Sequence, residues 1–181
     1  MGKSKDTLVW IDMEMSGLNP DTDVVLEVAL VLTNSALEII SEGPDLIIKQ
    51  DASLFAQMDS WNQEHHSKSG LWNSVIHSQI SLEEAEDKIL AYMEEHLFAK
   101  VSPLCGNSIA QDRMFLRKYM PRVHEYLHYR MIDVSTIKEL VKRWYPKGVS
   151  GPSKANAHRA LDDIKESIAE LKFYQDNYFV K

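Results

Sequence analysis

The sequence predicts an α/β protein in which α-helices flank a mixed β-sheet. Apolar runs joined by short turns fill the first 50 residues, a pattern that indicates neighbouring antiparallel strands. Strand-like and helix-like segments then alternate towards the C-terminus, as they do where helices connect the strands of one sheet. A chain of 181 residues can bury one sizeable core, so we expect a single domain over residues 1–181.

The first apolar run, Leu8–Met15, is bounded by polar residues and has the length of a buried strand. The turn-forming residues Ser16–Asp21 separate it from a second strand, and Asn34–Ala36 form a turn into a third. We expect Gly43-Pro44 to interrupt the extended pattern before it resumes at Leu46. The strands expected in this region span residues 8–15, 23–33, 37–41 and 46–50.

Helices are expected where apolar residues recur at spacings of three and four. Ser81 followed by Glu84 matches a capping box, and we expect Ser135 or Thr136 to cap a later helix. The expected helical segments span residues 53–58, 62–78, 81–97, 109–119, 135–144 and 157–174. Two further strands are expected at 101–105 and 129–134, and the segment 145–154, with two glycines and two prolines, is expected to be a loop.

Composition restricts the possible partners. The net charge of −7 argues against a protein that binds long or duplex nucleic acid through many phosphate contacts, but not against an enzyme that holds a short oligonucleotide. No apolar stretch is long enough to span a bilayer, so no membrane partner is expected. The one cysteine, Cys105, lies in a strand-like segment and is expected to be a small core residue, which fits a reducing cytoplasm.

Two carboxylates, Asp12 and Glu14, stand one residue apart at the end of the first strand. Residues i and i+2 of a strand project from the same face, so both side chains point the same way. Like charges beside apolar neighbours are costly unless a cation neutralises them, and oxygen ligands suit Mg²⁺ or Mn²⁺. The alternative is an edge strand that carries two solvated acids.

Further acids and a histidine stand later in the chain. Asp112 falls in the first turns of a helix, where the helix dipole alone would favour an acid. His158, Asp162 and Asp163 surround the start of the last helix, where they could equally be surface residues.

In order and spacing, these residues resemble the DEDD exonuclease superfamily in its histidine-bearing branch. Within it, the chain is similar to the oligoribonuclease family. The segments that carry the resemblance are Trp10–Leu18, Cys105–Ile109, Asp112-Arg113, Asp133–Thr136 and His158–Ile164. The resemblance implies a ribonuclease-H-like fold, a homodimer, and a 3′-to-5′ exoribonuclease that hydrolyses very short RNAs of two to five nucleotides to mononucleotides.

The resemblance also implies roles for the acids and the histidine. Two divalent cations, Mg²⁺ or Mn²⁺, would be held by carboxylates, with Asp12 placed to bridge them. Glu14 and Asp163 would complete one coordination shell, and Asp112 would serve the other ion. His158 would be the general base, because an imidazole is largely neutral at pH 7–8. Asp162 is expected to remain a solvated residue or to lie behind the ligands.

Two apolar side chains are candidates for stacking against bases. Leu18 follows the first strand in a turn, and Trp61 stands in a polar context that is unusual for a core tryptophan. A half-buried structural tryptophan is the alternative. Tyr129 would reach the catalytic site of a neighbouring subunit if the protein is a dimer, although a core tyrosine is nearly as consistent with its surroundings. His65, His66 and His77 are expected at the surface or behind the ligands, and by resemblance His66 could lie near the substrate.

The resemblance further implies a pocket for the 5′-phosphate of the substrate. Its hydroxyls, helix amides and guanidinium would come from Ser108, Arg130, Ser135 and Thr136. Each residue alone is consistent with an ordinary cap or surface charge. Such a pocket would limit the site to short substrates.

Two other functions stay open. An exonuclease that trims longer RNA or single-stranded DNA would share the metal site but should have a more basic surface. A catalytically idle binding module would be expected to lack some of the metal ligands.

Overall fold

A computed structural model of the chain describes residues 2–145, 147, 151 and 159–179. Its five strands form one mixed sheet in the order β3-β2-β1-β4-β5. β1 pairs antiparallel with β2, and β2 antiparallel with β3, whereas β1–β4 and β4–β5 are parallel. The strand bounds are β1 Leu8–Met15, β2 Val25–Thr33, β3 Ile39–Ile47, β4 Leu104–Gly106 and β5 Met131–Asp133. The mixed sheet expected from the sequence is thereby confirmed.

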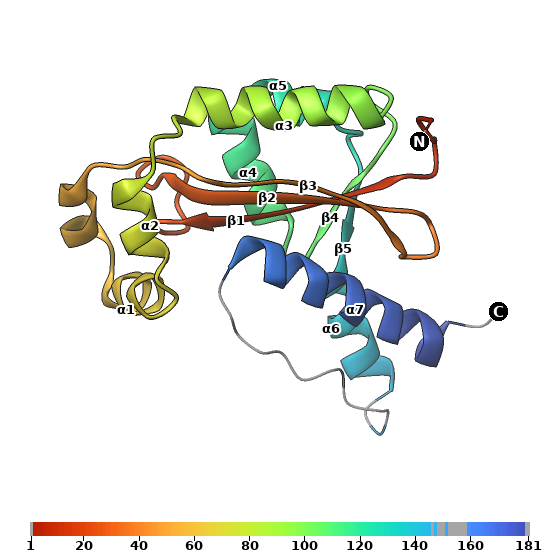
Figure 1. The fold of residues 1–181 in the computed structure, drawn as a ribbon. Coiled ribbons are helices and arrows are strands. Elements are labelled where there is room, and N and C mark those ends of the chain that lie inside the picture. Colours follow the sequence, from red (N-terminus) through yellow and green to blue (C-terminus); the bar gives the residue numbers. More distant parts are fainter. Residues whose placement is uncertain (1, 146, 148–150, 152–158, 180–181) are drawn as a thin grey trace.

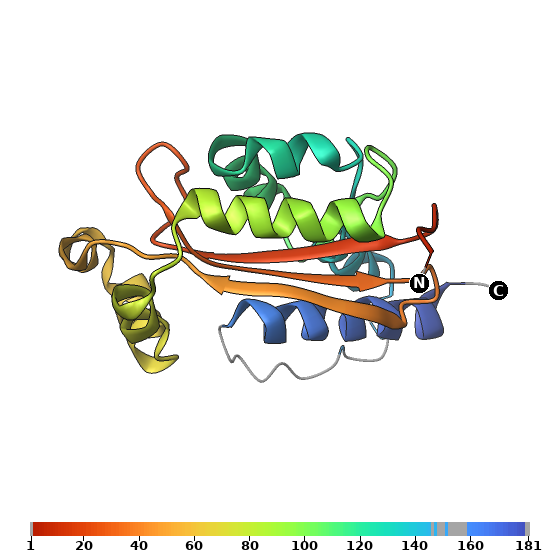
Figure 2. The same cartoon turned by 45° about the horizontal axis from the view of Figure 1, so that its top comes forward.

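Helices cover both faces of this sheet (Figure 1). α3, α4 and α5 lie on one face, and α6 and α7 lie on the other, as the turned view in Figure 2 also shows. The short helices α1 and α2 lie beyond one end of the sheet. The bounds are η1 Ala52–Gln57, α1 Ser60–Lys68, α2 Leu71–His77, α3 Leu82–His96, α4 Ala110–Tyr119, α5 Pro121–Tyr126, α6 Val134–Trp144 and α7 Ala160–Tyr178. In the described part of the chain, no helix has the length and apolar character that crossing a membrane requires.

Because side chains alternate along β1, the strand contributes residues to the hydrophobic core on both faces of the sheet. Val9, Ile11 and Met13 belong to the cluster under α3 and α4, whereas Trp10 belongs to the cluster under α7. β2 is buried along its whole length, as a central strand between two helical layers should be.

The expected break at Gly43-Pro44 is wrong, because β3 continues through it. β3 is an edge strand, where the missing N–H of proline costs no ladder hydrogen bond. The pairing shifts register between Val31–Glu42 and Ala29–Asp45, which accommodates one extra residue as a bulge. A Cβ at Gly43 would stand 2.8 Å from the Tyr92 ring, so the close approach of α3 requires glycine there.

The helix expected over residues 62–78 is two helices. Gly70 takes a left-handed φ of +74° and ends α1 while opening α2. Ser81 caps α3 as expected, with its hydroxyl 3.1 Å from the Glu84 amide, but the Glu84 carboxylate pairs with Lys88 instead of completing the capping box.

Two details near the parallel strands also differ from expectation. α5 was not predicted, although Pro121 at its first position is a helix-start signal. The cap of α6 is Asp133, whose carboxylate accepts from the Ser135 amide at 2.9 Å, and not Ser135 or Thr136. The loop expected at 145–154 lies largely outside the described residues.

Cys105 is fully buried on β4, as expected, and burial raises the pKa of its thiol far above the usual range. We therefore expect the native protein not to react with a thiol reagent such as DTNB at pH 8, and to react with one equivalent after unfolding in guanidinium chloride. Stoichiometric labelling of the native protein would contradict the packing described for β4.

Candidate active site

β1 carries the first two carboxylates. Asp12 and Glu14 are its partly exposed residues near the C-terminal end and alternate with buried neighbours, so both project from the same face. Oxygens of Asp12, Glu14 and Asp163 lie within 4.8 Å of one another. The sequence-predicted acids on β1 and on the last helix are thus brought together.

Asp163 reaches this cluster from the first turn of α7. The start of that helix is fixed by Glu27, a fully buried carboxylate on β2 that pairs in register with Glu14. Its oxygens accept from Arg159 Nη2 at 2.7 Å and Nε at 2.9 Å, and from the Ala160 amide at 3.2 Å. Glu27 therefore performs the capping role for a helix whose own N-cap residue makes no side-chain cap.

Asp112 reaches β1 from the opposite helical layer. β4 ends at Gly106 and pairs with β1 only at Val9 and Trp10, so the far end of β1 has an open edge. Asp112, in the first turn of α4, occupies this edge and accepts from the Met13 amide at 3.0 Å. It is 6% exposed.

The ionised forms of these carboxyl groups are strongly disfavoured when no cation is bound. Burial and then repulsion from Asp112, Glu14 and Asp163 raise the pKa of Asp12 well above its usual range. Burial followed by repulsion from Asp163 raises the pKa of Glu14 to about 8, against which Arg159 acts weakly. Burial raises the pKa of Asp112 to about 7, although its backbone hydrogen bonds oppose the shift. Buried carboxylate oxygens with such mutual repulsion fit a hard divalent cation as their neutralising partner.

Asp112 is the largest source of charge repulsion on Asp12, whereas Asp163 is the largest on Glu14. Asp12 therefore experiences charge repulsion from Asp112 as well as from Glu14 and Asp163. Asp162, the neighbour of Asp163, is exposed. His158 lies outside the described residues.

The sequence did not assign a role to two residues near the carboxylates. His66 is buried on α1, where its Nε2 donates to the Met15 carbonyl at 2.9 Å and its Nδ1 lies 4.0 Å from Glu14. It therefore lies buried beside Glu14 and not at the surface. Glu27 was overlooked, although a lone acid in the otherwise apolar run Val25–Leu32 is a detectable signal.

The two stacking candidates are exposed. Leu18 is 74% exposed in the turn after β1, and its carbonyl accepts from the Gln111 side chain. Trp61 is 57% exposed on α1 and stacks on His65, with ring centroids 3.7 Å apart. Large exposed apolar side chains are available for contact with a ligand.

Two of the four residues expected to bind a terminal phosphate are in contact. The Ser108 and Ser135 hydroxyl oxygens lie 3.1 Å apart, and a shallow cavity along the start of α6 is lined by Ser135 and Thr136. The guanidinium of Arg130 lies 5.4 Å from the centre of the Tyr129 ring. Tyr129 is 72% exposed and lines a separate cavity between α4 and α5.

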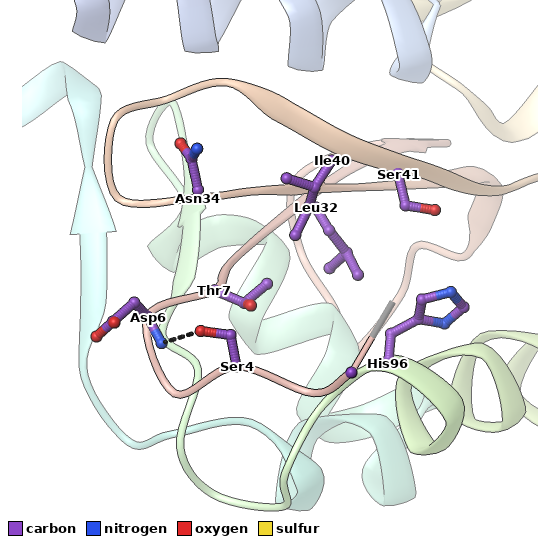
Figure 3. Close-up of a pocket in the computed structure, with 9 residues that line it drawn as sticks. Ser4, Asp6, Thr7, Leu32, Asn34, Ile40, Ser41 and His96 are labelled. Carbon is purple, nitrogen blue, oxygen red and sulfur yellow. Dashed lines mark hydrogen bonds between the residues drawn. The ribbon is translucent and has the colours of Figure 1, made fainter.

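A further cavity of about 420 Å³ lies where the N-terminal segment meets β2, β3 and the end of α3 (Figure 3). Ser4, Asp6, Thr7, Asn34 and His96 are among its lining residues. It contains none of the residues expected to take part in catalysis or substrate binding.

Comparison with known proteins identifies the family to which the chain belongs. The RNase_T family model, described as exonuclease, matches residues 9–171. The oligoribonuclease of Shewanella loihica is 48% identical over 179 residues, which cover 99% of each chain. The oligoribonuclease of Shewanella baltica is 49% identical over 174 residues, or 96% of each chain, and that of Aromatoleum aromaticum is 47% identical over 178 residues, covering 98% of this chain and 97% of the relative.

Solved structures support the fold. An exonuclease I structure superposes with a TM-score of 0.75 at 15% identity, covering 96% of this chain and 41% of that chain. Escherichia coli exonuclease I in complex with an oligonucleotide gives a TM-score of 0.74 at 15% identity, with coverage of 97% and 42%. This chain spans about two fifths of the exonuclease I chains, which therefore establish only the ribonuclease-H-like fold. The sequence identity over nearly the whole length, together with the exonuclease family match, shows that this chain belongs to the oligoribonuclease family.

Proposed function

We propose that this protein is a metal-dependent 3′-to-5′ exoribonuclease that hydrolyses very short RNAs, dinucleotides above all, to 5′-mononucleotides. The observation that carries the proposal is the convergence of Asp12, Glu14 and Asp163, with Asp112 beside them, at one edge of β1. Oligoribonuclease is the name of its relatives at 47–49% identity. Residues 1–181 would act as one exonuclease domain, and the family match over residues 9–171 supports this.

Four carboxylates would hold the metal. Asp12 is repelled by all three of the other carboxylates, which supports a role shared between two ions, in which Glu14 and Asp163 would complete one shell and Asp112 would serve the other. Two bound Mg²⁺ or Mn²⁺ ions would neutralise phosphate charge and supply an activated water. His158 would take the proton from that water, because neutral imidazole accepts a proton near pH 7.

The substrate would be held by few groups. The exposure of Leu18 and Trp61 supports stacking of bases on them, and the contact between Ser108 and Ser135 beside Thr136 supports a pocket for the terminal phosphate. The acidic net charge favours a short substrate over a long one.

We propose a homodimer in which Tyr129 acts at the partner's site, while Arg130 contributes its guanidinium to the phosphate pocket. The exposure of Tyr129 and its position next to β5, which forms one edge of the sheet, support the role of Tyr129. The buried, unpaired thiol of Cys105 is consistent with a cytoplasmic protein.

The direct test is the dependence of rate on RNA length. With 5′-phosphorylated RNAs of two, three, five and fifteen nucleotides and Mg²⁺ or Mn²⁺, we expect kcat/KM to be highest for the dinucleotide and at least about tenfold lower for the fifteen-mer, a difference of ~1.4 kcal/mol. Equal or faster trimming of the fifteen-mer would favour general 3′-end processing. No hydrolysis at any length would favour an idle binding module.

Adjacent aspartates provide a matched control for the metal site. Asp163→Asn should reduce dinucleotide hydrolysis by about 10³-fold, because it removes a ligand from the cluster. Asp162→Asn, one residue away on the same helix but exposed, should stay within about twofold of the wild-type rate. The reverse pattern would show that the ligand has been assigned to the wrong aspartate.

A further inference from the structure

Asn107 connects the proposed phosphate pocket to two buried polar residues of α7. Its amide nitrogen donates to Ser167 Oγ at 2.8 Å and to Glu170 Oε2 at 3.2 Å. Its carbonyl oxygen accepts from Ser135 Oγ at 3.0 Å. One side chain in the β4–α4 connection therefore links α6 to α7.

Glu170 determines which way this amide faces. It is 2% exposed, forms an ion pair with Lys138 at 3.2 Å, and accepts from the Tyr174 hydroxyl at 2.9 Å. A carboxylate in an ion pair has no proton to donate, so the Asn107 group that faces it must be the NH₂. The carbonyl of Asn107 is consequently turned towards Ser135.

The direction of the Ser135 hydroxyl follows from that of Asn107. A serine hydroxyl has one proton, and Ser135 uses it for the Asn107 carbonyl. In the 3.1 Å contact between the two serines, Ser108 must then be the donor. The Ser108 amide also donates to Ser135 Oγ, at 3.0 Å. The hydroxyl proton of Ser135 is therefore used by Asn107. The Ser108 hydroxyl, in contrast, can rotate away from Ser135 and donate to an incoming ligand.

Ser108 needs such support. Its φ of +50° is a left-handed conformation that residues with a Cβ adopt at a cost of ~1 kcal/mol. Its amide is held by Ser135 Oγ and by Asp133 Oδ1 at 2.9 Å. One of the two hydrogen bonds that hold the Ser108 amide thus depends on the orientation that Asn107 gives to Ser135.

We propose that Asn107 is a positioning residue for the 5′-phosphate end of the substrate, acting through Ser135 on Ser108. Ser108 is the hydroxyl that turns to the phosphate, and Ser135 holds it in place. This inference rests on the proposed function, because it assigns a role inside the pocket proposed there.

The test compares two diadenosine dinucleotides that differ only in a 5′-phosphate or a 5′-hydroxyl. With Asn107→Ala, we expect KM for the phosphorylated substrate to rise about tenfold, since one hydrogen bond to a charged group is weakened. The kcat for both substrates and the KM for the 5′-hydroxyl substrate should stay within about twofold. Ser108→Ala should cause a similar loss, and the double variant should lose little more than either single one.

Two further variants keep the outcome decisive. Ser167→Ala removes one partner of Asn107 without touching the pocket and should give a smaller shift in the same direction, and it replaces Asn107→Ala if that variant fails to fold. Asn177→Ala, an exposed asparagine on the same helix, is the matched control and should change neither constant.

The outcomes separate the inference from the proposed function. Equal losses on both substrates, or no change in the KM ratio, would overturn the positioning role while the exoribonuclease proposal stands. A wild-type enzyme that hydrolyses both dinucleotides equally would overturn the phosphate pocket and the role of Asn107 with it. A wild-type protein inactive on both would overturn the proposed function itself.

Discussion

Asp12→Asn is expected to reduce hydrolysis severely and at the same time make the metal-free protein more stable. Asparagine has the shape of aspartate but removes the charge on which Asp112, Glu14 and Asp163 all act. In the absence of metal, that repulsion is uncompensated, so its removal should raise the stability by about 2 kcal/mol, or Tm by ~4–8 °C. Activity should fall about 10³-fold, because a shared metal ligand is lost.

The pH dependence of this effect has a definite sign. A carboxyl group whose folded pKa is raised contributes full stability below its unfolded pKa and loses it as the pH rises through the folded value. For Glu14 this window runs from its usual value of 4.5 to about 8. The Tm of the wild-type protein in EDTA should therefore fall between pH 5 and pH 8, less steeply in Asp12→Asn.

Differential scanning fluorimetry with and without metal provides the measurement. Added Mn²⁺ should raise the Tm of the wild-type protein and have much less effect on Asp12→Asn, because a ligand stabilises the state that binds it. Asp162→Asn should behave like the wild type. A metal-free Asp12→Asn that melts below the wild type would contradict the electrostatic account of the cluster.

Glu27→Ala is expected to damage both the fold and the catalytic site. It would leave Arg159 and the Ala160 amide without their acceptor, which should cost about 3 kcal/mol, or ~6–12 °C in Tm. Loss of the negative charge also relieves repulsion on Asp12, where Glu27 is the smallest of the contributors named, and on Glu14, where Glu27 ranks after Asp163. The lost ion pair and helix cap outweigh this relief, so α7 should shift and carry Asp163 with it.

Glu86→Ala is a closely matched control. Glu86 is also buried, accepts from a backbone amide at the start of a helix, and binds the guanidinium of the same residue, Arg122. This pair joins α3 to α5 and includes none of the four carboxylates of the candidate site. Both variants should be destabilised, but only Glu27→Ala should lose more than about tenfold in kcat per folded molecule. Equal kcat values in the two variants would show that Glu27 has a purely structural role.

Local patterns predicted the features that depend on local geometry. The spacing of Asp12 and Glu14 was sufficient to place them on one strand face, and Ser81 was sufficient to start α3. Features that depend on distant contacts were not predictable in this way. Glu27 meets a partner 132 residues away, and Pro44 is tolerated only because β3 is an edge strand.

The same reasoning explains the errors in helix boundaries. Ser135 has the chemistry of a cap, but the preceding Asp133 takes that role and leaves the Ser135 hydroxyl for Asn107. Gly70 could have been a tolerated glycine within a helix, and only its left-handed φ reveals the break. The arrangement of Leu18, Trp61 and Tyr129 around a substrate stays a prediction, because their exposure does not identify what they contact.

The short length of β4 gives the active site a built-in reporter. The Met13 amide lies in a strand, yet its hydrogen bond ends on the Asp112 carboxylate and not on a neighbouring backbone. Its hydrogen-exchange rate and its ¹⁵N chemical shift should therefore follow the state of that carboxylate, while the amides of Val9 and Ile11 report on the sheet. Titration of labelled protein with metal would then distinguish occupancy of the site from general tightening of the fold, without any substrate present.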